Sequence, residues 1–218
     1  IFVPELSAAQ ATLVEGIDVI PVASLTQLCR HLNKEKPIPA AVHVVTESSK
    51  STNLIDFADI YGQEHAKRAL EIAVAGHHNI HLSGPPGAGK TMMARALLSI
   101  MPRPSKDEVI AITKLHSLAG EITDEVRHER PFRSPHHTSS SVALIGGGKN
   151  PKPGEISLAH KGILFLDELP EYTRSCLEAL RQPLEDRVVT IARAQDTVVF
   201  PADFMFVSTQ NPCPCGYY

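Results

Sequence analysis

The chain has 218 residues, 43% of them apolar, and a formal net charge of −3 at pH 7. It contains no apolar run long enough to span a membrane, so we expect no membrane partner. The slightly acidic balance gives no overall electrostatic footprint for nucleic acid, so such a partner would need local basic patches or an assembled ring.

The first 45 residues predict an α/β unit with strands at Ile1–Pro4 and Ile17–Val22. We expect helices at Ser7–Val14 and at Ser24–Leu32, the second capped by Ser24. This set is too small to fold alone, and the chain opens without an initiating Met or a signal segment. We therefore expect the end of a larger domain, in a fragment of a longer protein. The polar residues 46–54 predict a linker to a second domain, residues 55–218.

The second domain opens with a segment that precedes the helix Gln63–Ala75, whose apolar face includes Leu70 and Ala73. By position, Ile60, Tyr61 and Gly62 are candidates for contact with adenine, and we assign this contact to Tyr61 and Gly62. A plain turn that faces the core fits this position equally well.

The stretch Gly84–Thr91 fits the P-loop pattern, between a predicted strand, Asn79–Ser83, and a predicted helix, Thr91–Met101. Its glycines allow successive N–H groups to turn inward around phosphate oxygens, and the positive end of the helix adds to the attraction. Lys90 would reach the β- and γ-phosphates, and the Thr91 hydroxyl would ligate Mg²⁺. The alternative is a Gly/Pro turn without a ligand. We expect ATP contacts from Gly84, Pro85, Pro86, Gly87, Ala88, Gly89, Lys90, Thr91 and Met92.

A second motif lies at Gly162–Leu166, an apolar run of buried-strand length that ends in Asp167 and Glu168. Asp167 would hold the Mg²⁺ shell, and Glu168 would polarise the attacking water. The alternative is an acidic pair that faces solvent at the end of a strand. Together with the P-loop, the carboxylates favour a nucleotide-hydrolysing site.

The remaining segments predict several short elements. Val109, Ile112 and Leu115 recur at helical spacing, and residues 131–154 predict an irregular insert rich in Pro, Gly and Ser. Beyond it we expect a short helix at 154–161, a helix marked by Leu177, Leu180 and Leu184, a hairpin of Val188–Ile191 with Thr197–Phe200, and a strand at Met205–Ser208.

His136 and His137 are adjacent, so on a strand they would point to opposite faces and would not share a metal ion. The four cysteines, Cys29, Cys176, Cys213 and Cys215, do not form a disulfide framework for a chain of this length. A reducing cytoplasm fits them best. Two thiolates alone, as in Cys213 and Cys215, cannot close a tetrahedral zinc shell.

Several motifs together resemble the Mg-chelatase-like AAA+ ATPases, and most of all their bacterial YifB/ComM branch: Gly62-Gln63, the P-loop, Arg130–His137, Gly146–Gly148, Pro153–His160, Phe165–Glu168 and Asn211–Gly216. The resemblance implies an α/β P-loop NTPase with a three-layer parallel sheet, an insert at helix 2 and a β-hairpin before the sensor strand. It also implies that residues 1–45 end a Lon-like, ribosomal-S5-type domain. Proteins of this family continue with further cysteines, so a zinc site that includes Cys213 and Cys215 in the full protein stays an open alternative, and we assign no zinc ligand.

The resemblance makes Asn211 the sensor that contacts the γ-phosphate and water, so Glu168, Lys90 and Asn211 are the expected catalytic residues. It places the arginine finger and the helical lid beyond Tyr218, so we expect this fragment to bind ATP and Mg²⁺ with little turnover. The full-length protein would be an ATPase.

Three functions fit the resemblance. The first is a hexameric, ring-forming motor that acts on DNA, as in branch migration or unwinding during natural transformation, with Arg187 and Arg193 facing a central pore. The second is a motor for metal insertion into a porphyrin, which the Lon-like remnant disfavours. The third is a nucleotide-binding assembly module without turnover.

Overall fold

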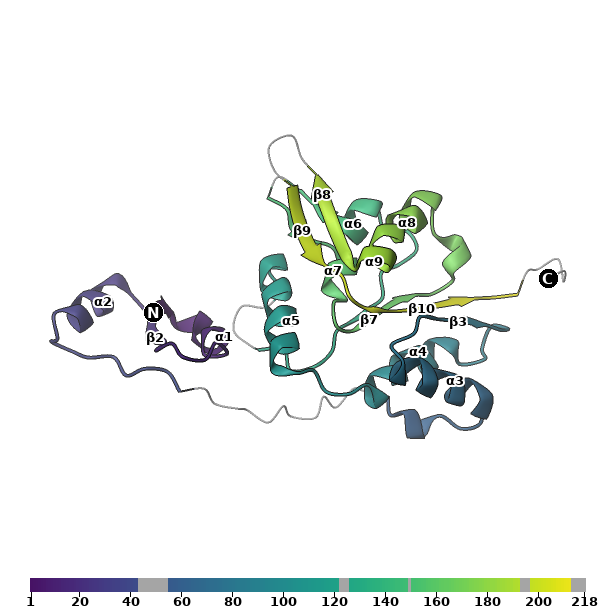
Figure 1. Cartoon of the computed structure of the whole chain (residues 1–218), viewed down its shortest axis with the longest axis horizontal. Helices are drawn as coiled ribbons and strands as arrows, with labels where there is room; N and C mark the ends of the chain where they lie inside the picture. Colours follow the sequence, from purple (N-terminus) through teal and green to yellow (C-terminus); the bar gives the residue numbers. More distant parts are fainter. Residues whose placement is uncertain (43–54, 122–125, 149, 193–196, 213–218) are drawn as a thin grey trace. The chain divides into compact units, whose positions relative to one another are not determined.

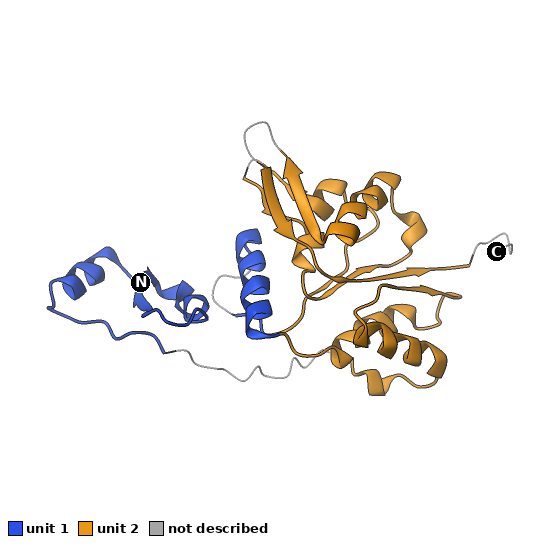
Figure 2. Cartoon of the chain, viewed as in Figure 1, with its two compact units in different colours: residues 1–50, 105–128 blue, residues 51–104, 129–218 orange. Residues whose placement is uncertain are grey.

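The computed structural model describes residues 1–42, 55–121, 126–148, 150–192 and 197–212. The chain divides into two compact units, one of residues 1–50 with 105–128 and one of residues 51–104 with 129–218 (Figure 2). The predicted linker, residues 46–54, lies outside the described residues, and the assignment of residues 1–45 to a Lon-like domain stays a prediction. In the described part of the chain, no helix is long and apolar enough to cross a membrane.

The first unit holds a small parallel sheet in which β1 (Phe2–Pro4) pairs with β2 (Ile20–Val22). The strand predicted at Ile17–Val22 is therefore shorter than expected, because β1 offers partners only to its last three residues. The helix predicted at Ser7–Val14 is also shortened. A 3₁₀ turn, Glu5–Ser7, leads into α1 (Ala8–Ala11), and beyond it the N–H groups of Leu13 and Val14 donate to carbonyls only three residues back, so the α-helical pattern ends.

Two longer helices of this unit have good sequence signals. α2 (Leu25–Leu32) begins where predicted, because the Ser24 side chain accepts a hydrogen bond from the Gln27 N–H. α5 (Lys106–Ala119) begins with a capping box and buries the predicted face of Val109, Ile112 and Leu115. It ends at Gly120, whose φ of +83° suits a residue without a Cβ.

The second unit is built on a parallel sheet of four strands in the order β3-β10-β7-β4, of which Figure 1 labels β3, β10 and β7. The strands are β3 (Ile80–Ser83), β10 (Met205–Gln210), β7 (Ile163–Leu166) and β4 (Phe132–Arg133). All four residues of β7 are buried, as the continuous apolar run predicts. Because all four strands are parallel, their carboxyl ends meet at one edge of the sheet, which carries the candidate site.

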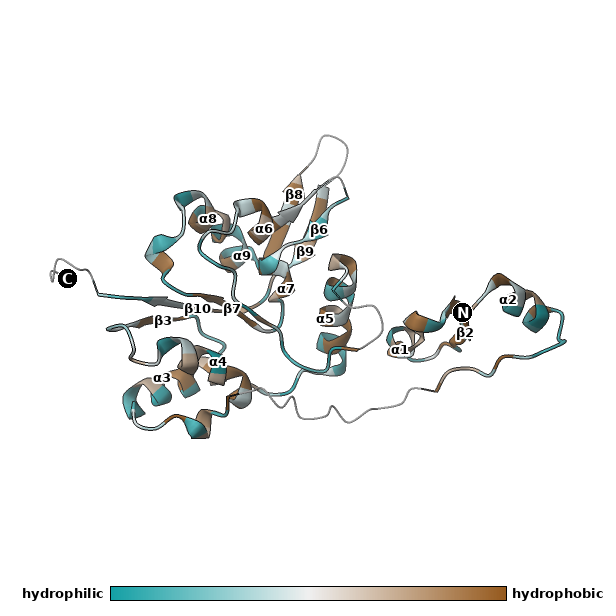
Figure 3. Ribbon diagram, turned by 180° about the vertical axis from the view of Figure 1, so that it is seen from behind, coloured by the Kyte–Doolittle hydropathy of each residue, from teal (hydrophilic) through white to brown (hydrophobic). Residues whose placement is uncertain are grey.

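Helices cover both faces of this sheet, and β7 shows why. Ile163 and Phe165 enter one apolar core, whereas Leu164 and Leu166 enter another, because successive side chains of a strand point to opposite faces. The first core packs against α3 (Glu64–Ala75) and α4 (Lys90–Ile100), and apolar residues colour β7 and α4 brown in Figure 3. The second core includes residues of three short helices: α6 (Ser141–Ile145), α7 (Glu155–Leu158) and α8 (Arg174–Ala179). A fourth short helix, α9 (Arg181–Asp186), follows α8 and packs against it. The three-layer α/β fold is thus confirmed.

The prediction of an irregular insert at residues 131–154 is wrong at several places. β4 lies at the sheet edge because the Ile163 N–H donates to the Pro131 carbonyl and the ring of Phe132 stacks on Phe165, with 5.7 Å between centroids. α6 begins where the Ser140 side chain accepts from the Ala143 N–H. After it, β5 (Gly146–Gly147) and β6 (Lys152–Pro153) form a two-stranded antiparallel pair.

The helix predicted from Leu177, Leu180 and Leu184 is also interrupted, and Leu184 is exposed. Leu180 ends α8 and begins α9, and Pro183 cannot donate the backbone hydrogen bond that would continue one helix.

The predicted hairpin is confirmed: β8 (Val188–Ala192) pairs antiparallel with β9 (Thr197–Pro201), and Val189 and Phe200 lie opposite each other and are both buried.

Candidate nucleotide-binding site

The P-loop connects β3 to α4 at the carboxyl edge of the sheet. Gly87 and Gly89 have φ of +80° and +81°, which residues with a Cβ rarely adopt. The Gly84 N–H donates to the Gln210 carbonyl at 3.3 Å and so ties the start of the loop to β10. No side chain caps the amino end of α4, which leaves its first N–H groups available to an anion.

Lys90 begins α4, and its ammonium group folds back on the loop. Lys90 Nζ donates to the carbonyl oxygens of Gly84 at 2.7 Å and Pro85 at 2.9 Å, and to Asn211 Oδ1 at 3.1 Å. All three donors of the ammonium group therefore have acceptors, and they form one cluster with the end of β10.

Thr91 and Asp167 meet across the same edge, as their predicted shared role requires. The Thr91 hydroxyl donates to Asp167 Oδ2 at 2.9 Å, although the two residues come from α4 and from the end of β7. A hydroxyl and a carboxylate are the oxygen ligands that Mg²⁺ prefers. This donor set, beside a loop whose Gly87 faces open space, fits a cation with a phosphate ligand.

Glu168 follows Asp167 in the left-handed region, with φ of +53° and ψ of +54°. Its carboxylate is exposed, and Glu168 Oε1 accepts from Asn211 Nδ2 at 3.2 Å. Asn211 thus bridges Lys90 and Glu168 through the two ends of its amide. The five residues predicted from the motifs, Lys90, Thr91, Asp167, Glu168 and Asn211, are brought together by these contacts.

Thr209 is a site residue to which the sequence analysis assigns no role. It is fully buried, its hydroxyl donates to Asp167 Oδ1, and it accepts from the Glu168 N–H at 3.0 Å. A signal for it does exist in the sequence. Side chains two positions apart on an extended segment share a face, so Thr209 belongs with Asn211.

Three further residues predicted to contact the nucleotide are Tyr61, Gly62 and Met92. Tyr61 is 93% exposed and Met92 is 43% exposed, and Gly62 has a φ of +72° that opens the turn into α3. Ile60 is buried in the first core, as expected for a turn that faces the core. The adenine contacts stay a prediction.

Tyr172 ties the segment after Glu168 to the segment after β4. Its hydroxyl donates to the Pro135 carbonyl at 2.5 Å, and its side chain is buried. Burial, and then the negative charge of Asp167, with a further electrostatic contribution from Cys176, raise the pKa of Tyr172 to about 12. The hydroxyl therefore stays a donor at physiological pH.

The strand geometry expected for His136 and His137 is wrong, because both residues lie beyond the end of β4. Their rings are near each other, with centroids 4.0 Å apart, and His136 Nδ1 lies 2.8 Å from Thr138 Oγ1. Among the described residues, no cluster of three or more His, Cys, Asp or Glu side chains is arranged to hold a metal. Cys213 and Cys215 lie outside the described residues.

The fold and the site define an α/β P-loop NTPase of the AAA+ class. The family model described as magnesium chelatase, subunit ChlI, matches residues 56–218. Competence protein ComM of Haemophilus influenzae is 45% identical over 222 residues, which cover all of this chain and 44% of that protein. The uncharacterized protein YifB of Salmonella typhimurium is 41% identical, over all of this chain and 43% of that protein.

The chain belongs to the Mg-chelatase-like AAA+ family, in its ComM/YifB branch. It spans less than half the length of these curated relatives. Among solved structures, a complex of the magnesium chelatase subunits BchI and BchD matches with a TM-score of 0.60 and 23% identity, over 75% of this chain and 56% of that chain. This likeness supports the fold.

Proposed function

We propose that the chain binds ATP with Mg²⁺ at the P-loop and that the full-length protein hydrolyses it. The observation that carries this proposal is the cluster of hydrogen bonds that joins Lys90 to Asn211 and Glu168, and Thr91 to Asp167. Five polar side chains from three elements converge at one edge of the sheet, next to a glycine loop and an uncapped helix end. An acidic pair that merely faces solvent would not need these partners.

Each residue has a distinct role in this proposal. Lys90 would exchange the carbonyls of Gly84 and Pro85 for phosphate oxygens, and Thr91 and Asp167 would hold the cation. A bound Mg²⁺ would supply positive charge to the phosphate oxygens as negative charge develops on them.

Glu168 accepts the proton of the attacking water once Asn211 turns its amide toward the phosphate. In the structure, Asn211 contacts both Lys90 and Glu168.

We propose further that the full-length protein is a ring-forming motor that acts on DNA. Support comes from the family branch and from the β8–β9 hairpin, which would be repeated around a ring. Arg193 lies outside the described residues. Arg187 lies at the base of the hairpin, where its guanidinium is 3.5 Å from Asp203 Oδ1 and its side chain is 69% exposed. Because an exposed ion pair of this kind is weak, both arginines remain candidates for contact with DNA.

Metal insertion into a porphyrin is a weaker alternative. The 67 kDa magnesium-chelatase subunit of Chlorobaculum parvum is only 26% identical, over 73% of this chain, against 45% for the competence protein. An assembly module without turnover is disfavoured by the Thr91–Asp167 pair, which such a module would not need.

The test measures ATP turnover by the full-length protein with and without single-stranded and branched DNA. We expect DNA to raise turnover, and Arg193→Ala to weaken DNA binding and flatten its salt dependence while ATP affinity is unchanged. DNA-independent turnover, with an unchanged salt slope in the variant, would favour a protein partner instead.

A further inference from the structure

The hydroxyl of Thr209 lies between the two acidic residues of the site. β10 runs beside β7 (Figure 1), and Thr209 comes one position after Ser208, which pairs with Leu166. The hydroxyl donates its proton to Asp167 Oδ1 and accepts the Glu168 N–H at 3.0 Å. Thr209 is fully buried, so water does not compete for either bond.

The first bond gives the two oxygens of Asp167 different partners. Oδ1 accepts from Thr209, whereas Oδ2 accepts from Thr91 at 2.9 Å. With Oδ1 held from the side of β10, rotation of the carboxylate is restricted and Oδ2 stays beside Thr91. Mg²⁺ demands near-ideal octahedral geometry, so a fixed carboxylate lowers the cost of ordering its ligands.

The second bond acts on the backbone of Glu168. A glutamate at φ of +53° is uncommon, and such a conformation persists only where the surroundings fix it. The Thr209 hydroxyl accepts the N–H of this residue, and the Glu168 side chain then reaches Asn211. Without the hydroxyl, that N–H would lose this acceptor.

We propose that Thr209 is a positioning residue that orients Asp167 for the cation and Glu168 for the water. The proposal rests on the proposed ATPase function and deepens it. A merely structural role would predict a loss of stability alone. The positioning role predicts in addition that ATP binding requires a higher Mg²⁺ concentration.

The test compares Thr209→Ser with Thr209→Ala in the full-length protein. Both variants lack the methyl group, and only the serine keeps a hydroxyl. Thr209→Val keeps the shape without the hydroxyl. Ser208→Ala is the matched control, because it removes a neighbouring buried hydroxyl that contacts His81 Nδ1 at 2.9 Å, away from the carboxylates.

The readout is ATP affinity as a function of Mg²⁺ concentration, together with ATP affinity in EDTA. In Thr209→Ala and Thr209→Val, we expect the Mg²⁺ midpoint to rise about 10-fold to 100-fold while affinity in EDTA is unchanged. Thr209→Ser should stay within about 3-fold of wild type, since a single hydroxyl can make both bonds. Ser208→Ala should keep the wild-type midpoint.

Equal midpoints for Thr209→Ser and Thr209→Ala would overturn the positioning role, and so would an equal shift in Ser208→Ala. The comparison of Thr209→Ser with Thr209→Ala remains informative even if Thr209→Val fails to fold. A wild-type protein that shows no Mg²⁺-dependent ATP binding would instead refute the proposed function itself, and the inference with it.

Discussion

Replacing Lys90 with alanine removes the only ammonium group that contacts the P-loop carbonyls in the described residues. Lys90 Nζ donates to Gly84 O, Pro85 O and Asn211 Oδ1 at 2.7, 2.9 and 3.1 Å. Binding exchanges these neutral acceptors for anionic phosphate oxygens, so the ammonium group gains charge–charge attraction in addition to its hydrogen bonds, and a hydrogen bond to a charged group contributes about 1.5 to 3 kcal/mol.

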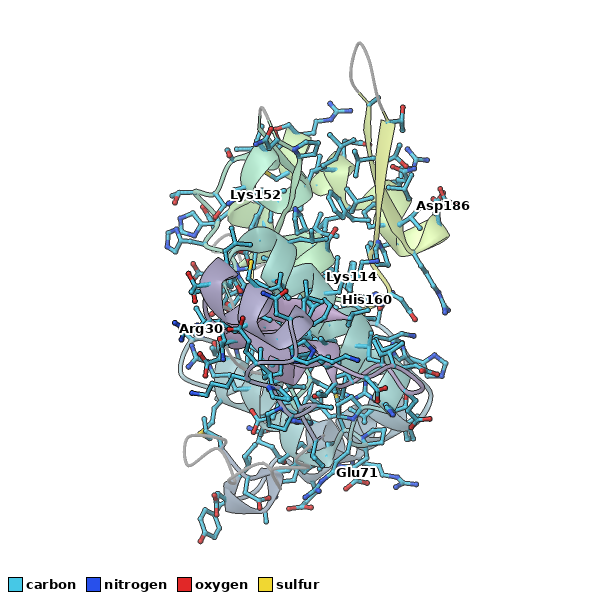
Figure 4. All side chains as sticks on the ribbon, turned by 90° about the vertical axis from the view of Figure 1, so that its left-hand side faces the viewer. Arg30, Glu71, Lys114, Lys152, His160 and Asp186 are labelled. Carbon is cyan, nitrogen blue, oxygen red and sulfur yellow. The ribbon has the colours of Figure 1, made fainter. Side chains whose placement is uncertain are left out.

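The expected loss of binding free energy in Lys90→Ala is therefore about 1.5 to 3 kcal/mol, which weakens ATP affinity about 10-fold to 150-fold. Isothermal titration calorimetry with Mg-ATP measures it directly. Lys114→Ala removes the same charge from an exposed position on α5 (Figure 4) and should leave affinity unchanged. Equal affinity of the Lys90→Ala and wild-type proteins would refute the assignment of the loop.

Two further predictions concern stability. Tyr172→Phe leaves the Pro135 carbonyl without its donor and should cost about 1 to 2 kcal/mol at pH 8 by urea unfolding. The pKa of Tyr172 is about 12 in the folded protein against 10.0 in the unfolded chain, so the extra stability of the wild type over Tyr172→Phe should decrease as pH rises from 10 to 12. A difference in unfolding free energy that stays constant over this pH range would contradict the prediction. Burial alone would raise the pKa of Asp203, but the hydrogen bond and charge of Lys161, and then Arg187, hold it below 3.8. The stability that this carboxylate contributes is present above pH 3.8 and is lost as pH falls through the lower folded pKa. Asp203→Asn should therefore lower the free energy of unfolding by about 1 kcal/mol at pH 7 and by less near pH 2. Equal acid unfolding curves for the variant and the wild type would contradict this prediction.

Local signals in the sequence were sufficient for much of the fold. Patterns contained within one segment predict five elements: the strand and the helix of the P-loop, the buried strand β7, the helix α5 and the β8–β9 hairpin. Their apolar periodicity, caps and turns agree with the tertiary contacts, so a short window of residues is informative.

Elements that depend on distant partners were not predictable in this way. β4 has only two residues, Phe132 and Arg133, and exists because β7 pairs with it. The pairing of Arg187 with Asp203, and the Thr209 contacts with both acidic residues, arise only when β7, β8 and β10 are assembled. The sequence predicted which kinds of side chain form the site, whereas it did not predict the hydrogen bonds between them.

The most direct test of the central claim replaces Glu168 with glutamine in the full-length protein and measures ATP binding and ATP turnover side by side. The amide keeps the size of the side chain but cannot accept the proton of water as the carboxylate does. We predict ATP affinity within about 3-fold of wild type and turnover lower by about 100-fold or more. Wild-type turnover in Glu168→Gln would contradict the account.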